Sequence, residues 1–179
     1  MSLQTRYEEL CETPSDISEH LPTFVSLVRK TNAKHVVELG TRSGVSTIAW
    51  LYGLEHTGGH LTSVDLDPQP EIGDHDHWTF IQGDDLDRDV YLQLPDRVDI
   101  VFIDSSHAYK HTLVELNLYR WLVRPGGLIV LHDTENEQPF EVRPQPPFPV
   151  KRAVNEFCEA EGLTWENRPN NWGLGIIRL

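Results

Sequence analysis

The sequence predicts an α/β domain built on a mostly parallel sheet, with helices on both faces and an antiparallel strand pair towards its C-terminal end. Three observations support this class. Short apolar runs are separated by segments with helical periodicity. Several of these runs are apolar throughout, as in strands that are buried on both faces of a sheet. The last residues divide into two strand-like runs, which is typical of a hairpin that closes such a sheet.

Composition narrows the class of protein. The 179 residues suffice for one domain with a substantial core, so we expect residues 1–179 to form a single domain. A formal net charge of −13 disfavours binding to nucleic-acid phosphates. No run reaches the ~20 apolar residues of a membrane span, the first residues lack a secretion signal, and Cys11 and Cys158 have no metal-type spacing. We expect a cytoplasmic protein whose partner is a small molecule, with no role for nucleic acid or membrane.

Helices are predicted from their periodicity. Residues 1–33 form a helical N-terminal segment, in which Ser15 or Asp16 caps a helix over Ile17–Thr31. The connection of residues 67–77 is polar, contains two prolines and has no helical period, so its crossover helix is missing or reduced. The other helices are expected at Val45–Leu54, Thr112–Val123 and Val150–Glu161, with a weak one near Asp87–Leu94.

Strands are predicted from the apolar runs between these helices. Gly126-Gly127 is expected to turn the chain into the fifth strand. The parallel strands are expected at His35–Leu39, Leu61–Leu66, Trp78–Gln82, Val98–Ile103 and Leu128–Leu131, and the closing pair at Leu163–Glu166 and Gly173–Leu179.

The turn after the first strand is the most informative motif. It has the pattern E-x-G-x-x-x-G, with Glu38 at the end of the strand and with Gly40 and Gly44 in the turn. Glycines allow a tight turn and a close backbone approach to a ligand. A dinucleotide-binding turn would have the spacing G-x-G-x-x-G. An anion would be repelled by Glu38, so the pattern favours a nucleotide-like ligand that carries positive charge.

Acidic residues also follow the later strands. Asp65 ends the second strand roughly twenty residues after the glycine turn, where nucleoside-binding sheets accept hydrogen bonds from the ribose hydroxyls. Asp104 and His107 follow the fourth strand, and His132-Asp133 follow the fifth. The carboxyl ends of parallel strands meet at one edge of a sheet, where open α/β sheets bind ligands. The sequence therefore predicts one site at this edge.

These motifs resemble those of a known family. The glycine turn resembles the first motif of class I S-adenosylmethionine (SAM) methyltransferases. The D-x-x-H element at Asp104, the Gly126-Gly127 turn and the residues His132-Asp133 resemble the small O-methyltransferases related to the catechol, macrocin and cephalosporin-type enzymes. The resemblance covers roughly residues 15–133. It implies a Rossmann-like, seven-stranded, mostly parallel sheet with a C-terminal antiparallel hairpin, and SAM as the cofactor.

The resemblance also assigns roles to residues. An acidic residue after the third strand meets the adenine in such enzymes; Asp84 matches best by position, and Asp85 is the competitor. Asp104 and Asp133 would hold a divalent cation, Mg²⁺ or Mn²⁺, and His107 would be the base that deprotonates the acceptor hydroxyl, with Asp104 as its catalytic companion. The implied cofactor-binding residues are Glu38, Gly40, Thr41, Ser43, Gly44, Ser46, Asp65, Asp84, Asp85 and Asp104.

One position departs from the family pattern. Metal-dependent relatives carry an acidic pair or Asp-Asn where this chain has His132-Asp133. As a ligand, an imidazole would favour manganese, iron or zinc over magnesium. As a structural residue, His132 would point to the core or hydrogen-bond Asp133. Both interpretations of His132 stay open at this point.

The methyl acceptor is not identified by any motif. The resemblance implies a hydroxyl of a small catechol-, sugar- or natural-product-like molecule. The proline-rich residues 135–149 suggest a lid, and Phe140, Phe148 and Trp172 are candidates to line the acceptor pocket. A nicotinamide-dependent oxidoreductase and a non-catalytic SAM-binding protein are the alternative functions. Whether the domain forms a homodimer also stays open.

Overall fold

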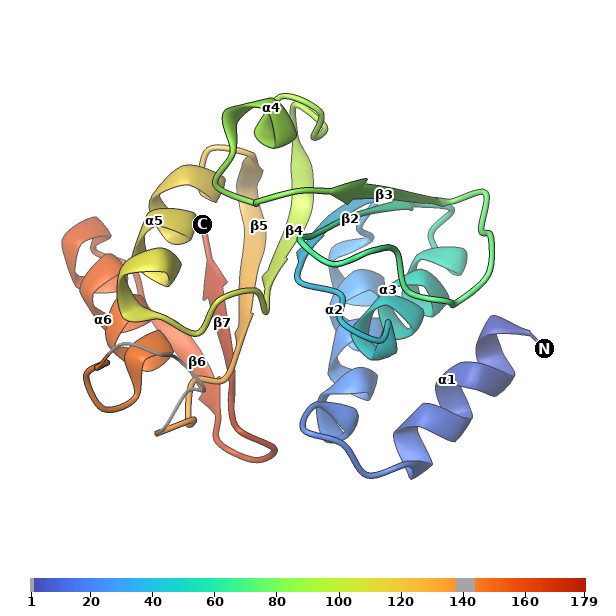
Figure 1. Cartoon of the computed structure of the whole chain (residues 1–179), viewed down its shortest axis with the longest axis horizontal. Helices are drawn as coiled ribbons and strands as arrows, with labels where there is room; N and C mark the ends of the chain where they lie inside the picture. The colour runs from blue at the N-terminus through green and yellow to red at the C-terminus, as the bar shows by residue number, and fades with distance from the viewer. Residues whose placement is uncertain (1, 138–143) are drawn as a thin grey trace.

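Seven strands form one mixed sheet in the computed structural model, which describes residues 2–137 and 144–179 (Figure 1). The strand order is β3-β2-β1-β4-β5-β7-β6. The first five strands run parallel, and β7 is antiparallel to both of its neighbours. This confirms the predicted fold class. The strands are β1 His35–Leu39, β2 His60–Asp65, β3 Trp78–Gln82, β4 Val98–Ile103, β5 Val123–His132, β6 Trp165–Arg168 and β7 Leu174–Arg178.

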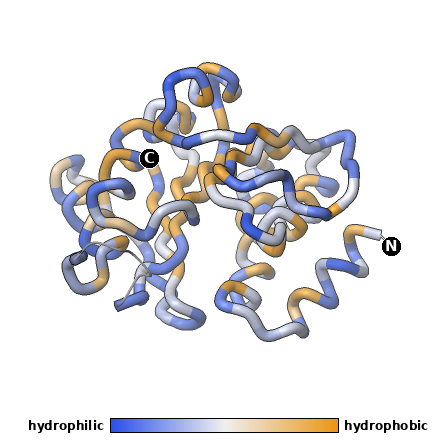
Figure 2. Tube along the Cα trace, in the orientation of Figure 1, coloured by the Kyte–Doolittle hydropathy of each residue, from blue (hydrophilic) through white to orange (hydrophobic). Residues whose placement is uncertain are grey.

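Helices cover both faces of the sheet. The N-terminal helices pack on one face and the later helices α5 and α6 on the other, as Figure 1 shows. Figure 2 shows apolar residues along the central strands and polar residues on the surrounding loops. The helices are α1 Leu3–Glu12, α2 Leu21–Thr31, α3 Val45–Glu55, the single turn α4 Arg88–Tyr91, α5 Tyr109–Tyr119 and α6 Pro149–Glu161, with a 3₁₀ turn η1 at Ser18–His20.

The sheet separates two apolar cores. On one face Phe24 of α2, Trp50 of α3 and Phe102 of β4 form a fully buried aromatic cluster, with ring centroids 4.4 to 5.5 Å apart. On the other face Tyr119 of α5 and Phe157 of α6 pack against the strands. Burying these large side chains on both faces makes the central strands rigid supports for the loops at their ends.

The N-terminal segment differs from the expectation. The predicted helix over Ile17–Thr31 is wrong in its first residues, because the α-helix begins only at Leu21 and a 3₁₀ turn precedes it. Pro22 lies in the first turn of α2, where its missing N–H costs no hydrogen bond and its fixed φ favours a helix start. The periodicity also missed α1, which has no fully buried residue and therefore a weak pattern.

The boundary between α5 and β5 also differs. The predicted helix Thr112–Val123 instead begins at Tyr109 and ends at Tyr119, since Val123 pairs with Val98 of β4. Gly126-Gly127 is not a turn before the strand but part of β5, where the register with β4 shifts. A Cβ on Gly127 would lie 2.7 Å from the carbonyl oxygen of Asp99, so only glycine allows this pairing. The expectation that residues 67–77 lack a crossover helix is confirmed.

No helix in the described ranges is long and apolar enough to cross a membrane.

Candidate functional site

A cavity of about 630 Å³ opens at the carboxyl edge of the parallel strands. Its walls come from residues 40–43 after β1, 64–67 at the end of β2, 83–85 after β3 and 104–107 after β4. The structure thus brings together the loops that the sequence singled out. Of the predicted site residues, those lining the cavity are Gly40, Thr41, Ser43, Ser46, Asp65, Asp84, Asp85, Asp104 and His107.

The glycine turn lies against the end of β4. Gly40 has φ +89°, and a Cβ built on it would be 2.2 Å from the carbonyl oxygen of Asp104. The Gly40 N–H donates to the Val64 carbonyl (2.8 Å), and the Asp104 N–H donates to the Leu39 carbonyl (2.8 Å). The sheet ladder therefore continues into the turn. These bonds hold three of the cavity loops in one rigid arrangement.

Asp65 supports the same turn. Its Oδ2 accepts hydrogen bonds from the N–H of Thr41 (2.6 Å), the Thr41 hydroxyl (2.9 Å) and the N–H of Arg42 (3.0 Å), and its Oδ1 accepts from the N–H of Asp67. Burial raises the pKa of Asp65, but these hydrogen bonds outweigh it and lower the pKa overall. Asp65 is thus a stable carboxylate that lines the cavity.

Glu38 lies beneath the turn and not among the residues that line the cavity. Its side chain is fully buried, and its carboxylate accepts hydrogen bonds from the hydroxyls of Ser46 (2.7 Å), Thr47 (2.9 Å) and Ser63 (2.6 Å). Burial raises its pKa to about 7 despite these donors. Gly44, which begins α3 with φ +83°, also lies outside the lining. Glu38 and Gly44 therefore support the turn without lining the cavity.

The structure distinguishes the two acidic residues after β3. Asp84 is exposed at the cavity, where its Oδ1 accepts a hydrogen bond from the N–H of Leu86 (2.8 Å). Asp85 is buried, and its Oδ1 lies 3.0 Å from Nε2 of His111 on α5. Glu115, one helical turn further along α5, lies 3.8 Å from the same nitrogen. The Asp84 side chain is therefore exposed at the cavity, whereas the Asp85 carboxylate faces His111.

A compact cluster forms where β4 and β5 end. Nε2 of His107 lies 2.9 Å from Oδ2 of Asp133 and 3.4 Å from Oδ1 of Asp104. Asp133 has φ +62°, a left-handed conformation that turns the chain at the end of β5. Burial lowers the pKa of His107, but the hydrogen bonds and charges of Asp104 and Asp133 raise it to about 10. The pKa of both carboxyl groups is lowered, because their imidazole partners outweigh burial.

His132 joins the same cluster from inside the protein. Its Nε2 donates to the backbone carbonyls of Asp16 and Asn171, each 3.1 Å away. Its Nδ1 faces Asp133 (3.1 Å) and Asp104 (3.4 Å). Because carbonyl oxygens only accept, Nε2 must carry the proton, which leaves Nδ1 to a second proton or a cation. Burial lowers the pKa of His132, and the two carboxylates raise it to about 11.

Trp172, a predicted pocket residue, lines the cavity from the β6–β7 turn. Two other residues of the site, Asp16 and His111, were not predicted as site residues. Asp16 lines the cavity from the N-terminal segment. No short sequence pattern places such distant segments together. For His111 a signal existed, because its spacing from Glu115 by four residues puts both on one face of a helix. That spacing was the available signal.

The sheet order, the glycine turn after β1 and the cavity at the carboxyl edge define a seven-stranded α/β domain of the methyltransferase type. A family model described as a methyltransferase domain matches residues 37–134, more than half of the chain. The chain belongs to this family. The matched segment runs from β1 to the residue after Asp133. It therefore contains the cluster at the ends of β4 and β5 and the group of Asp85, His111 and Glu115.

Individual relatives agree with this. A proposed O-methyltransferase from Mycobacterium sp. strain JLS is 36% identical over 118 residues, covering 59% of this chain and 51% of the relative. The chain spans about half the length of the curated relatives it matches. Among solved structures, the O-methyltransferase TomG of Streptomyces achromogenes, in complex with SAM, aligns with a TM-score of 0.67 and 18% identity, covering 100% of this chain and 90% of TomG. An O-methyltransferase from Bacillus cereus in complex with SAH aligns with a TM-score of 0.67 and 16% identity, covering 98% of this chain and 91% of that chain. These structural likenesses show the fold.

Proposed function

We propose that the protein is a SAM-dependent O-methyltransferase that acts on a hydroxyl group of a small molecule. The main observation behind this proposal is that one cavity is lined by the glycine turn, by Asp65 and Asp84, and by Asp104 and His107. The family membership and the relatives named as O-methyltransferases support the same function. A nicotinamide-dependent oxidoreductase, the alternative drawn from the same fold, has no support from the family match.

SAM would lie along the carboxyl edge of the sheet. In this arrangement the glycine turn approaches the cofactor closely, Asp65 accepts hydrogen bonds from the ribose hydroxyls, and Asp84 faces the adenine amino group. Oδ1 of Asp65 accepts only from the N–H of Asp67 and keeps a lone pair for a ribose hydroxyl, whereas Oδ2 is occupied by the three donors of the turn. Glu38 acts indirectly: its buried carboxylate holds the start of α3 against β2 through Ser46 and Ser63.

Methyl transfer requires a deprotonated acceptor oxygen, and His107 is the candidate base. The residues around it also fit a divalent cation. Asp104, His107 and Asp133 offer ligand atoms within 4.8 Å of one another, and Nδ1 of His132 faces the same two carboxylates. The other ring nitrogen of His132, Nε2, donates to backbone carbonyls, as metal-binding histidines commonly do. We assign Asp104, Asp133 and His132 as the residues that would hold the cation, which lowers the pKa of a bound hydroxyl and orients its oxygen.

The acceptor would enter between the β6–β7 turn and the N-terminal segment. Trp172 and Asp16 line the cavity on this side, next to His107. Trp172 is 42% exposed, so its ring offers an apolar surface to a planar or sugar-like acceptor. Phe148 lies at the start of α6 outside the cavity lining, and Phe140 is outside the described residues. Of the candidate lid, residues 138–143 also lie outside the described part, so the lid stays a proposal.

Thermal-shift and calorimetric titrations with SAM, S-adenosylhomocysteine and NADH test the cofactor assignment. We expect SAM and S-adenosylhomocysteine to raise the melting temperature and NADH to leave it unchanged. A shift with NADH alone would contradict the proposal. Single-turnover assays with methyl-labelled SAM and a panel of catechols, sugars and hydroxylated natural products then test catalysis. SAM binding without transfer to any acceptor of the panel would favour the non-catalytic alternative.

A further inference from the structure

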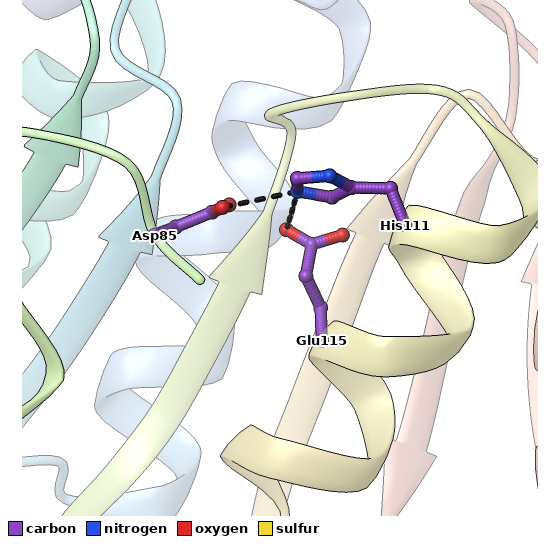
Figure 3. Close-up of side chains that lie close together, drawn as sticks. All are labelled: Asp85, His111 and Glu115. Carbon is purple, nitrogen blue, oxygen red and sulfur yellow. Dashed lines mark hydrogen bonds and ion pairs between the residues drawn. The ribbon is translucent and has the colours of Figure 1, made fainter. Parts of the chain in front are cut away.

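A second cluster of metal-binding side chains lies where the loop after β3 meets α5. It consists of Asp85, His111 and Glu115 and shares no residue with the cluster of Asp104, His107, His132 and Asp133. Figure 3 shows the carboxylates of Asp85 and Glu115 directed at the same ring nitrogen of His111. That nitrogen, Nε2, is 3.0 Å from Oδ1 of Asp85 and 3.8 Å from Oε1 of Glu115.

Both carboxylates are buried and incompletely paired. Glu115 has no exposed surface and Asp85 is 7% exposed. Oδ2 of Asp85 and Oε2 of Glu115 have no hydrogen-bond partner in the described part of the chain. A buried carboxylate oxygen without a partner is destabilising, because no hydrogen bond replaces its lost hydration. Two such oxygens in one cluster indicate that a group with positive charge belongs there.

The protein itself supplies only one imidazole for this charge. The single Nε2 position can donate one proton, yet it faces two acceptors. Two buried carboxylates therefore share one imidazole proton, and the cluster stays short of positive charge unless it takes up a further proton or a cation.

We propose that Asp85, His111 and Glu115 bind a divalent cation of the zinc or manganese class. Their donor atoms lie within 4.8 Å of one another, and the distances of 3.0 and 3.8 Å from Nε2 of His111 lie on either side of the ~3.5 Å that separates donors around a tetrahedral ion. Two carboxylate oxygens with one imidazole nitrogen favour zinc or manganese over magnesium or calcium. Three protein ligands leave a further coordination position open, as in catalytic zinc sites.

The surroundings fit such a site. The Ser105 hydroxyl donates to Oε1 of Glu115 (2.5 Å), which orients this carboxylate in the way that outer partners orient metal ligands. Asp85, His111 and Ser105 line the 630 Å³ cavity, so an ion can enter from solvent. The ligands come from the β3–α4 loop and from α5. A bound cation would fasten this loop, including the neighbouring Asp84, to the helix.

Zinc titration of metal-free protein tests the proposal without using activity. Asp133→Ala is the background, because it removes a donor of the first cluster. The matched variants add Glu115→Gln or Asp85→Asn to this background, and both substitutions preserve side-chain shape. Calorimetry with Zn²⁺, and Co²⁺ absorption as a spectroscopic substitute, measure binding. We expect one equivalent of zinc in the Asp133→Ala protein and at least about 100-fold weaker binding after either second substitution. Circular dichroism shows whether each variant is folded, and one folded variant, Glu115→Gln or Asp85→Asn, is enough for the comparison.

Two results would overturn the site. The Asp133→Ala protein binding no zinc would mean that the cluster is neutralised by a proton. Zinc affinity unchanged by both Glu115→Gln and Asp85→Asn would place the ion elsewhere, for example on surface histidines. Because SAM and acceptor are absent from these titrations, failure of the proposed methyl transfer would leave the result unaffected, and the reverse also holds.

Discussion

Gly40 and Asp104 touch through their backbones: a Cβ on Gly40 would lie 2.2 Å from the Asp104 carbonyl oxygen and 2.6 Å from its carbonyl carbon. The contact joins the glycine turn after β1 to the loop after β4. One of these loops lines the cavity beside Asp65, and the other carries Asp104 and His107. By our proposal, backbone atoms would therefore position the cofactor and the base relative to each other.

Gly40→Ala should destabilise the protein more than an ordinary left-handed glycine substitution. The left-handed conformation alone costs a non-glycine residue about 1–2 kcal/mol, and forcing a methyl group into the Asp104 backbone adds about 1–3 kcal/mol. Gly58→Ala is the matched control, since Gly58 has φ +64° and no atom within 4 Å of its Cβ position. Urea unfolding of both variants checks this. Equal losses of stability would mean that the contact with Asp104 relaxes without cost.

Asp65→Asn should weaken SAM binding while the domain stays folded. The change removes the charge that accepts from the Thr41 and Arg42 amides and, by our proposal, from the ribose hydroxyls. Charge-assisted hydrogen bonds contribute about 1.5–3 kcal/mol, so we expect affinity to fall by roughly 10- to 100-fold. Calorimetry against Asp76→Asn, an exposed residue outside the cavity lining, provides the comparison. Unchanged affinity would rule out the ribose role.

Glu38→Gln should abolish a pH-dependent loss of stability. The folded protein holds the Glu38 proton up to a pKa of about 7, whereas the unfolded chain releases it near 4.5. Between these values the folded state binds more protons, so wild-type stability should fall with rising pH, by about 3 kcal/mol relative to the variant. Urea unfolding from pH 4.5 to 8 measures the difference. Parallel profiles for the two proteins would show that Glu38 is ionised throughout.

His107→Ala should lower turnover by roughly 10²–10⁴-fold, as the loss of a general base typically does. The neighbouring carboxylates raise the pKa of His107 to about 10, so without a cation it is protonated at neutral pH and cannot accept a proton. Wild-type turnover in chelator should therefore rise with pH towards 10. Restored Mn²⁺ should shift this rise to lower pH, because it would offset the charge of Asp104 and Asp133.

The comparison protein for this experiment is His77→Ala, an exposed histidine outside the cavity lining. Metal binding by His107→Ala separates two roles. Retained binding with lost turnover supports the base, whereas loss of both would make His107 a ligand. Full turnover of His107→Ala at saturating SAM would remove it from the reaction altogether.

The inner strands β1, β2, β4 and β5 were predictable because they are buried on both faces and carry an unambiguous apolar pattern. The ends of β1 to β4 could be placed at one edge for the same reason, and the residues there do line one cavity. Helix ends were less predictable: the apolar pattern continued past Tyr119 because Leu122, in the turn after α5, and Val123, in β5, are buried apolar residues too. Local pattern does not tell which partner such residues take.

The role of Glu38 shows a second limit. Its position in the motif suggested a contact with the ligand, but three hydroxyls from α3 and β2 enclose it. The sequence of the turn does not predict the contact of Glu38 with Ser63, which lies 25 residues away. Likewise the carbonyls of Asp16 and Asn171, which determine the tautomer of His132, are 116 and 39 residues distant. Such partners follow from the assembled fold.

The position of Asn171 and Trp172 has a consequence for synthesis on the ribosome. His132 is held by the carbonyl of Asn171, and Trp172 forms a wall of the cavity, while β7 inserts between β5 and β6. Chains emerge N-terminus first at about 5–20 residues per second, so the five parallel strands can pair before this hairpin exists. The Asn171 carbonyl that holds His132 and the cavity wall at Trp172 are therefore added only after these residues have left the exit tunnel.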